Sequence, residues 1–235
     1  MKQLTTILLL CVAQIACAQH LVPNKEYRYR ATYDNDSLEI HTSSIVTFKT
    51  DGKPSKEDST QRNLYITFSY TPQDSIMCAK LPNMGWGHYG ATGYKDDDKE
   101  LWMHPPRANQ FLIMEVSPFP DIFFPLTDSS HYFTKFNTSD WWDVYRNLFL
   151  LHNYRVVGRD TINHIPYWHI NVRSTFRLIE KDEYKHSLTI SNFLFNEQEG
   201  FYSMEYRFFD KTHVKLVREE EPLKKTIKKH ITVHK

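Results

Sequence analysis

Apolar and polar side chains alternate with a period of two residues along much of this chain. The first such stretch places Tyr27, Tyr29 and Tyr33 on one parity and Arg28 and Arg30 on the other. A period of two is typical of β-strands that bury one face. The pattern recurs in seven stretches, at residues 25–33, 38–48, 64–70, 168–176, 188–195, 201–209 and 213–217. These stretches predict a mainly β protein.

Short polar segments separate several of these stretches, including residues 34–36, 196–200 and 210–212. Such segments are typical of tight reversals, and strands joined by tight reversals are antiparallel. No predicted strand alternates with a strong helix pattern, which disfavours a parallel sheet. We therefore predict a single, strongly curved antiparallel sheet, half-barrel or barrel-like, with one or two helices.

One helix is predicted at residues 139–150. Ser139 and Asp140 can cap its first turn, and the apolar positions 141, 145, 148 and 149 lie near one helical face. Residues 218–235 are predicted to form a charged C-terminal tail. Apolar residues spaced by four suit a surface helix there, but a frayed tail is an equal alternative.

The N-terminus has the features of an export signal. Lys2 precedes an apolar run over residues 7–13, and the small residues Ala16 and Ala18 match a signal-peptidase site. The run is shorter than the 20 or so apolar residues that span a bilayer, and nothing else in the chain resembles a membrane span. We expect cleavage after residue 18 and an exported mature chain. Lipoprotein processing at Cys17 is the less favoured alternative, because Gln14 stands where such signals carry an aliphatic residue.

The composition of the mature chain bounds its class. Residues 19–235 suit one large β-domain. The full chain has 29 Lys and Arg against 28 Asp and Glu, and because Lys2 leaves with the signal the mature chain is neutral. A neutral chain argues against binding of nucleic acid. Of the three cysteines, Cys11 and Cys17 lie near or in the signal, so Cys78 is expected to be a buried apolar residue without a disulfide partner.

Glycine is concentrated in one segment, since residues 84–94 hold four of the seven glycines beside three aromatic residues. The segment is either a ligand-facing loop or a hairpin or bulged strand pair whose aromatic residues pack. Two proline-rich stretches follow at residues 101–107 and 117–126, and their prolines predict edge or crossing segments rather than central strands.

The aromatic residues of this middle region form either core or the wall of a cavity. In the second case Arg107, held by two prolines, would meet the anionic head of a ligand at the rim, although an internal ion pair is an equal alternative. The candidate ligand-binding residues are Trp86, Tyr89, Trp102, His104, Arg107, Phe119, Phe123, Trp141 and Trp142.

The sequence contains no motif that compels a chemistry. It lacks H-E-x-x-H, paired C-x-x-C and G-x-S-x-G patterns, and Asp96, Asp97 and Asp98 lack the spacing of a calcium loop. We therefore predict no catalytic residue, no metal site and no cofactor.

Two resemblances extend this interpretation. Residues 100–107, 118–120 and 195–206 resemble segments of exported proteins of Gram-negative bacteria that have no established activity, so the resemblance implies no catalytic residue. Residues 167–217 are similar in rhythm to LolA/LolB-like lipoprotein carriers. This second resemblance implies an open half-barrel around an apolar cavity under helical cover.

The predicted function is that of a periplasmic or envelope-associated, non-enzymatic protein that binds an apolar or amphipathic, lipid-like ligand. One alternative is a structural or interaction module of the cell envelope, with another envelope protein as its partner. A second alternative is an exported hydrolase, which would place His104 in a polar cleft within reach of an acid.

Overall fold

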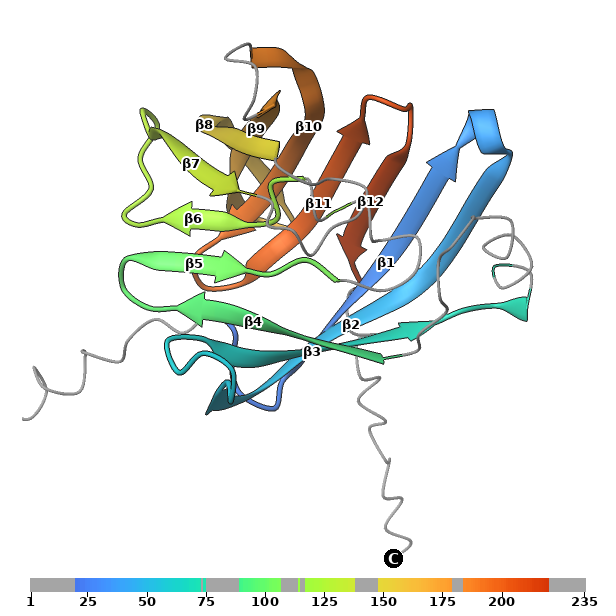
Figure 1. Cartoon of the computed structure of the whole chain (residues 1–235). Helices are drawn as coiled ribbons and strands as arrows, with labels where there is room; N and C mark the ends of the chain where they lie inside the picture. The colour runs from blue at the N-terminus through green and yellow to red at the C-terminus, as the bar shows by residue number, and fades with distance from the viewer. Residues whose placement is uncertain are drawn as a thin grey trace, which may run out of the picture.

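One twelve-stranded antiparallel sheet forms the fold (Figure 1). The computed structural model describes residues 20–72, 74, 89–106, 114, 117–137, 148–178 and 184–219. In the first half the strands are β1 (Glu26–Asn35), β2 (Ile40–Pro54), β3 (Arg62–Ser69), β4 (Tyr89–Asp96), β5 (Glu100–Met103) and β6 (Asp121–Phe123). In the second half they are β7 (His131–Asn137), β8 (Leu148–Ile162), β9 (Ile165–Leu178), β10 (Tyr184–Asn196), β11 (Gly200–Phe208) and β12 (His213–Arg218). This confirms the predicted fold class.

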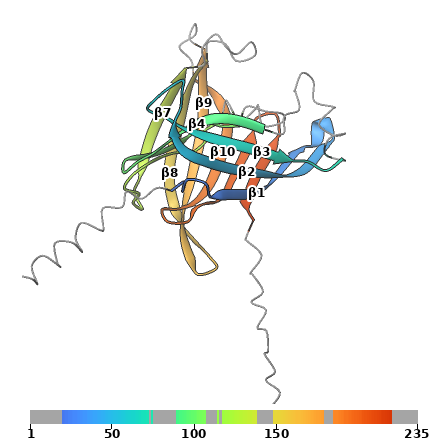
Figure 2. The ribbon, with the colours of Figure 1, turned by 90° about the horizontal axis from the view of Figure 1, so that it is seen from below.

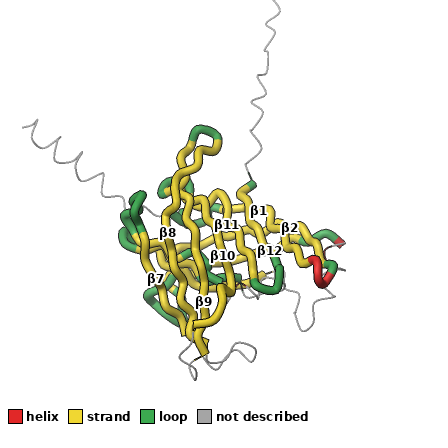
Figure 3. The backbone as a smooth tube through the Cα atoms, turned by 90° about the horizontal axis from the view of Figure 1, so that it is seen from above, coloured by secondary structure: helices red, strands yellow, loops and turns green. Residues whose placement is uncertain are grey.

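The sheet curves until its two ends meet. The strand order is β6-β5-β4-β3-β2-β1-β12-β11-β10-β9-β8-β7, so β6 and β7 are the end strands. The views from below and above show the resulting barrel-like shape (Figures 2 and 3). Side chains join the ends: the Tyr132 hydroxyl donates to the carbonyl oxygen of Asp121 at 3.0 Å, and the Tyr154 hydroxyl donates to that of Phe119 at 3.2 Å. We call this junction between β5–β6 and β7–β8 the seam.

Local turn chemistry sets the antiparallel register. Between β8 and β9, Asn163 and His164 both have positive φ angles, of 50° and 67°, as a two-residue hairpin of matching twist requires. Between β10 and β11, the Asn196 side-chain oxygen accepts from the backbone of Gln198 and Glu199, each at 2.8 Å. The predicted reversals at residues 196–200 and 210–212 are therefore confirmed.

The predicted helix is wrong at its C-terminal end, since residues 148–150 belong to strand β8. The physical reason lies in the residues that follow: Leu150, His152, Tyr154 and Val156 are all buried, which is a period of two that continues from the predicted helix into the sheet. Residues 139–147 lie outside the described residues. A short 3-10 helix, η1 (Asp36–Leu38), precedes β2 and contains Leu38, because the Asn35 side chain caps it by accepting from the Leu38 backbone at 3.0 Å.

The concave side of the sheet encloses a core that is rich in aromatic residues. Phe119, between β5 and β6 in the chain, is only 5% exposed, and its ring stacks on Tyr206 at 6.3 Å and meets Phe48 edge-on at 6.5 Å. Phe119 thus contacts strands that lie far from β6 in the sheet order. The crossing role predicted for residues 117–126 is confirmed, and side chains fill the centre of the barrel.

The first described residue is anchored at the sheet. The His20 Nδ1 atom lies 2.7 Å from a carboxylate oxygen of Asp96, and the other oxygen accepts from the Leu21 backbone at 2.8 Å. The His20 ring also stacks on Phe124 at a centroid distance of 4.6 Å. The mature N-terminus expected at Gln19 would therefore start one residue before a buried, fixed histidine.

No helix in the part of the chain described here is long and apolar enough to cross a membrane.

Candidate ligand-binding site at the seam

A small pocket lies in the seam between the two ends of the sheet. Its volume is about 110 Å³, below the roughly 300–1,000 Å³ of pockets that hold drug-sized ligands. It therefore has room for a small molecule or for one polar group of a larger molecule. Its lining residues are Trp102, Met103, His104, Pro105, Ser117, Pro118, Phe119, Asp121, Thr134, Lys135, Phe136, His152 and Tyr154.

Asp121 is the acidic group of the pocket. It precedes the fully buried Ile122 in β6, so its side chain lies on the opposite face of the strand, toward the seam. Its Oδ1 atom is buried and has no hydrogen-bond partner among the described residues. Burial, with the neighbouring Glu100 carboxylate as the second cause, raises the pKa of Asp121 to about 7. The carboxyl group is therefore partly protonated at neutral pH and can both donate and accept a hydrogen bond.

His152 is the second titratable group of the pocket that is withdrawn from water. It lies in β8 directly opposite Thr134 in β7 and is only 7% exposed. Burial lowers the pKa of His152 to about 4, so the ring is neutral at pH 7. Its Nδ1 atom is buried and lacks a partner within the described ranges. Asp121 and His152 thus bring two unpaired polar atoms to one small pocket.

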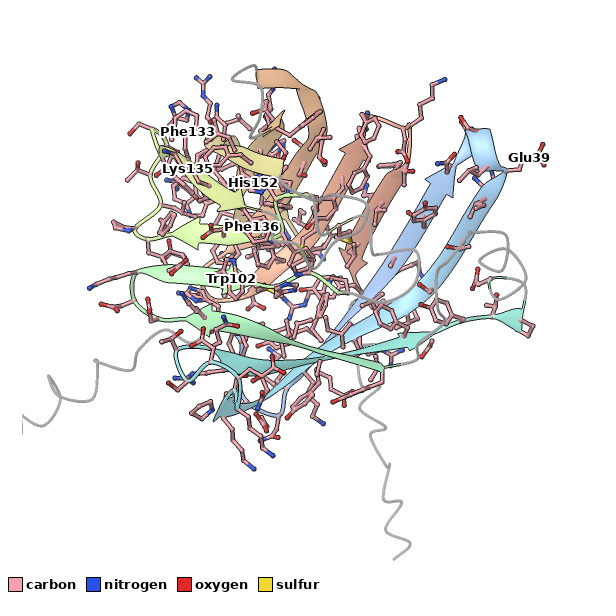
Figure 4. All side chains as sticks on the ribbon, in the orientation of Figure 1. Glu39, Trp102, Phe133, Lys135, Phe136 and His152 are labelled. Carbon is pink, nitrogen blue, oxygen red and sulfur yellow. The ribbon has the colours of Figure 1, made fainter. Side chains whose placement is uncertain are left out.

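Exposed aromatic side chains surround the pocket on the end strands. Phe123, Phe133 and Phe136 are 40%, 53% and 45% exposed. Phe136 lines the pocket itself together with Lys135, and Figure 4 shows both beside His152 and Trp102 at the seam. The ammonium group of Lys95 lies 5.9 Å from the centroid of the Trp102 ring. The pocket therefore combines a polar interior with an apolar rim.

The structure brings together three of the nine predicted ligand-binding residues. Trp102, His104 and Phe119 line the seam pocket, and Nδ1 of His104 lies 2.9 Å from the carbonyl oxygen of Pro105. Phe123 contacts the Tyr132 ring at 5.0 Å beside the pocket, whereas Tyr89 stacks on Tyr65 at 6.1 Å and does not line it. The other four, Trp86, Arg107, Trp141 and Trp142, lie outside the described residues.

Sequence reasoning missed Asp121, Thr134, Lys135 and His152. His152 carried a usable signal, because it shares the parity of Leu150, Tyr154 and Val156 in a stretch that alternates like a strand. A histidine on the apolar parity of a strand is a polar group placed toward a core. Asp121 carried no such signal, because its burial results from the meeting of β6 with β7 and β8.

The described residues contain no group of three or more His, Cys, Asp and Glu side chains that could hold a metal ion. What the pocket offers a ligand is hydrogen bonding and apolar contact.

Comparison with known proteins gives two structural likenesses. No family model matches the chain, and no curated protein matches it. One likeness is to a protein of Bacteroides fragilis NCTC 9343 named as exported and as having a YmcC-like fold, with 9% identity, a TM-score of 0.39, and coverage of 86% of this chain and 98% of that one. The other is to a protein of Parabacteroides distasonis ATCC 8503 named as a lipoprotein, with 10% identity, a TM-score of 0.44, and coverage of 87% and 98%.

Both names agree with the predicted resemblance to exported bacterial proteins, and neither mentions LolA or LolB. With both TM-scores below 0.5, these likenesses say nothing about the ligand or the activity of this chain.

Proposed function

We propose that this chain is an exported, non-enzymatic binding protein of the periplasm or cell envelope that holds an amphipathic ligand at the seam. The polar part of the ligand enters the pocket, and its apolar part lies on the aromatic rim. The export signal expected at residues 1–18 supports the location. One observation carries the binding role: two buried, unpaired polar atoms, on Asp121 and His152, line a pocket with an exposed aromatic rim.

The energetic argument for a ligand starts from those two atoms. A buried polar atom without a partner costs about 1–3 kcal/mol, so it is rare in proteins unless water or a ligand pairs with it. The exposed phenylalanine rings add apolar surface whose burial contributes roughly 25 cal/mol per Å². A ligand with a polar head and an apolar tail satisfies both features at once.

The position of this site differs from the cavity under the sheet that the LolA/LolB-like resemblance implied. Phe119 fills the centre of the barrel between Phe48 and Tyr206, and the pocket volume of about 110 Å³ is too small for an acyl chain. We therefore place only the head of the ligand inside the protein. The tail lies outside, across β6 and β7.

Calorimetric titration of the mature chain with three amphiphiles tests this proposal. The probes are n-octyl β-D-glucoside, decanoate and decyltrimethylammonium, each below its critical micelle concentration. At least one should bind, and Phe136→Ser should weaken that binding about tenfold or more, because loss of an aromatic contact of about 1.5–3 kcal/mol corresponds to this factor. Phe209→Ser is the matched control, since Phe209 is 64% exposed and does not line the pocket.

Two results would contradict the proposal. In the first, none of the three amphiphiles binds. In the second, an amphiphile binds but Phe136→Ser and Phe209→Ser leave its affinity equally unchanged, which would place the binding elsewhere.

A further inference from the structure

A row of polar side chains crosses four strands on the inner face of the sheet, starting at the seam pocket. Thr134 in β7 is directly opposite His152 in β8, His152 is opposite Ser174 in β9, and Ser174 is opposite Thr189 in β10. Directly opposite residues of antiparallel strands point to the same face, with Cβ atoms about 4.5–5.5 Å apart. The four side chains therefore form one continuous line, and its first two members line the pocket.

The row is buried but unpaired. His152, Ser174 and Thr189 are 7%, 0% and 1% exposed, and the Nδ1, Oγ and Oγ1 atoms of these side chains have no partner in the described parts of the chain. Ser191 and Tyr206, an opposite pair on β10 and β11, add two more buried hydroxyls in the same condition. Neighbouring Ser and Thr side chains in a sheet ordinarily stabilise it by bonding to each other. Here five adjacent polar groups share one face without doing so.

Apolar rows border the polar row on both sides. Toward one end of the strands, Leu150 and Leu188 are buried and pack with Phe176. Toward the other end, Tyr154 and Val172 are both fully buried. A ligand that meets this face therefore needs hydrogen-bonding groups in a narrow band with apolar surface on either side of them.

The charges of the row limit the ligand further. Ser and Thr hydroxyls both donate and accept, and neutral histidine does the same through its two ring nitrogens. Since burial keeps His152 neutral at pH 7, the row offers no charge to an anion or a cation. An alkyl chain would leave the hydroxyls unpaired. Hydroxyl groups on a ring with apolar C–H faces satisfy both the row and its borders.

We propose that the head of the ligand is an uncharged, polyhydroxylated group such as a sugar ring, which hydrogen-bonds to Thr134, His152, Ser174 and Thr189. This assignment rests on the proposed function and names the ligand class of the same site. The row extends from the seam pocket, so the head enters between the ends of the sheet. Trp102 at the mouth provides a flat apolar surface of the kind on which a sugar ring can lie.

The titration with three amphiphiles separates this inference from the proposed function. Their tails are comparable, whereas the heads are a sugar, a carboxylate and a quaternary ammonium. The glucoside should bind at least tenfold more tightly than decanoate and decyltrimethylammonium. Ser174→Ala and Thr189→Val should each weaken glucoside binding about tenfold. Each should also raise the Tm of the ligand-free protein by about 2–4 °C, because each removes a buried polar atom that has no partner.

Thr175→Val is the matched control. Thr175 is next to Ser174 in β9, but its hydroxyl lies 3.5 Å from the carbonyl oxygen of Leu151, and it does not line the pocket. Thr175→Val should leave glucoside affinity unchanged and should not raise the Tm. A gain in stability together with a loss of binding is the mark of a ligand site, which a purely structural row would not give.

Three outcomes would overturn the inference. If decanoate or decyltrimethylammonium binds more tightly than the glucoside, the head class is wrong while the amphipathic site stands. If Ser174→Ala and Thr189→Val lower the Tm and leave glucoside affinity unchanged, the row is structural. If none of the three amphiphiles binds, the proposed function fails together with this inference.

Discussion

Phe119→Ala will lower the free energy of unfolding by about 3–5 kcal/mol, as large-to-small changes of buried aromatic residues do. Phe119 is 5% exposed, and its ring packs between Phe48 and Tyr206 at the centre of the barrel. Alanine leaves a cavity there that the two neighbouring rings, each held by its own strand, cannot fill. Urea denaturation at 25 °C measures the change.

Phe209→Ala is the control for this effect, because a 64% exposed ring should change stability by about 0.5 kcal/mol or less. A cost below about 1 kcal/mol for Phe119→Ala would mean that residues 117–120 do not cross the centre of the barrel. The core would then be open, and an acyl chain could lie inside it.

Asp121→Asn will stabilise the protein at alkaline pH, and the gain will disappear in acid. Because the pKa of Asp121 is raised to about 7, the folded state binds more protons than the unfolded state between about pH 4 and pH 7. Wild-type stability from this group is therefore fully present below pH 4 and is lost as the pH rises through 7. Glu100 and Lys95 are the charged neighbours, and the asparagine variant removes the repulsion from Glu100. We expect the variant to be more stable than wild type by about 2–4 kcal/mol at pH 8 and equal to it near pH 4.

His152→Gln should give the opposite pH profile. The pKa of His152 is lowered to about 4, so the unfolded state binds more protons than the folded state between about pH 4 and 6.5. Wild-type stability from this group falls as the pH decreases through that range. The variant's stability relative to wild type should therefore be about 2–3 kcal/mol higher at pH 4 than at pH 7.

Difference curves against wild type, measured by urea denaturation from pH 4 to pH 8, check both expectations. The control is Asp128→Asn, since the Asp128 side chain is 76% exposed and pairs with Arg159 at the surface. Its difference curve should be flat. Flat curves for Asp121→Asn and His152→Gln as well would mean that water reaches both groups freely and that the seam is open.

The sequence was most informative where the structure is local. Tyr27, Tyr29 and Tyr33 announce β1, and Asn196 marks a reversal, because a period of two and turn chemistry depend on near neighbours only. The end of the predicted helix failed for a related reason. Ser139 and Asp140 resemble an N-cap, but Leu148 and Phe149 belong to a strand whose period is visible only when residues up to Val156 are included.

The candidate site could be predicted only in part. Trp102, His104 and Phe119 stood out because prolines and aromatic residues are concentrated around them. Asp121 and His152 meet because the sheet curves until β6 reaches β7 and β8, and no local pattern encodes that closure. The row from Thr134 to Thr189 depends likewise on the register of four strands. Register is a property of the pairing and not of any single stretch of sequence.

The most direct test of the seam site is the NMR spectrum of the histidine rings during titration with the tightest-binding of the three amphiphiles. The His152 signal is assigned by its loss in His152→Gln. His41 is the internal reference, since its exposed ring pairs with Asp34 at 3.1 Å, away from the seam. A ligand head in the pocket predicts a saturable shift of the His152 ring signals with His41 unchanged. A His152 signal that stays constant while calorimetry shows saturation would contradict the seam as the binding site.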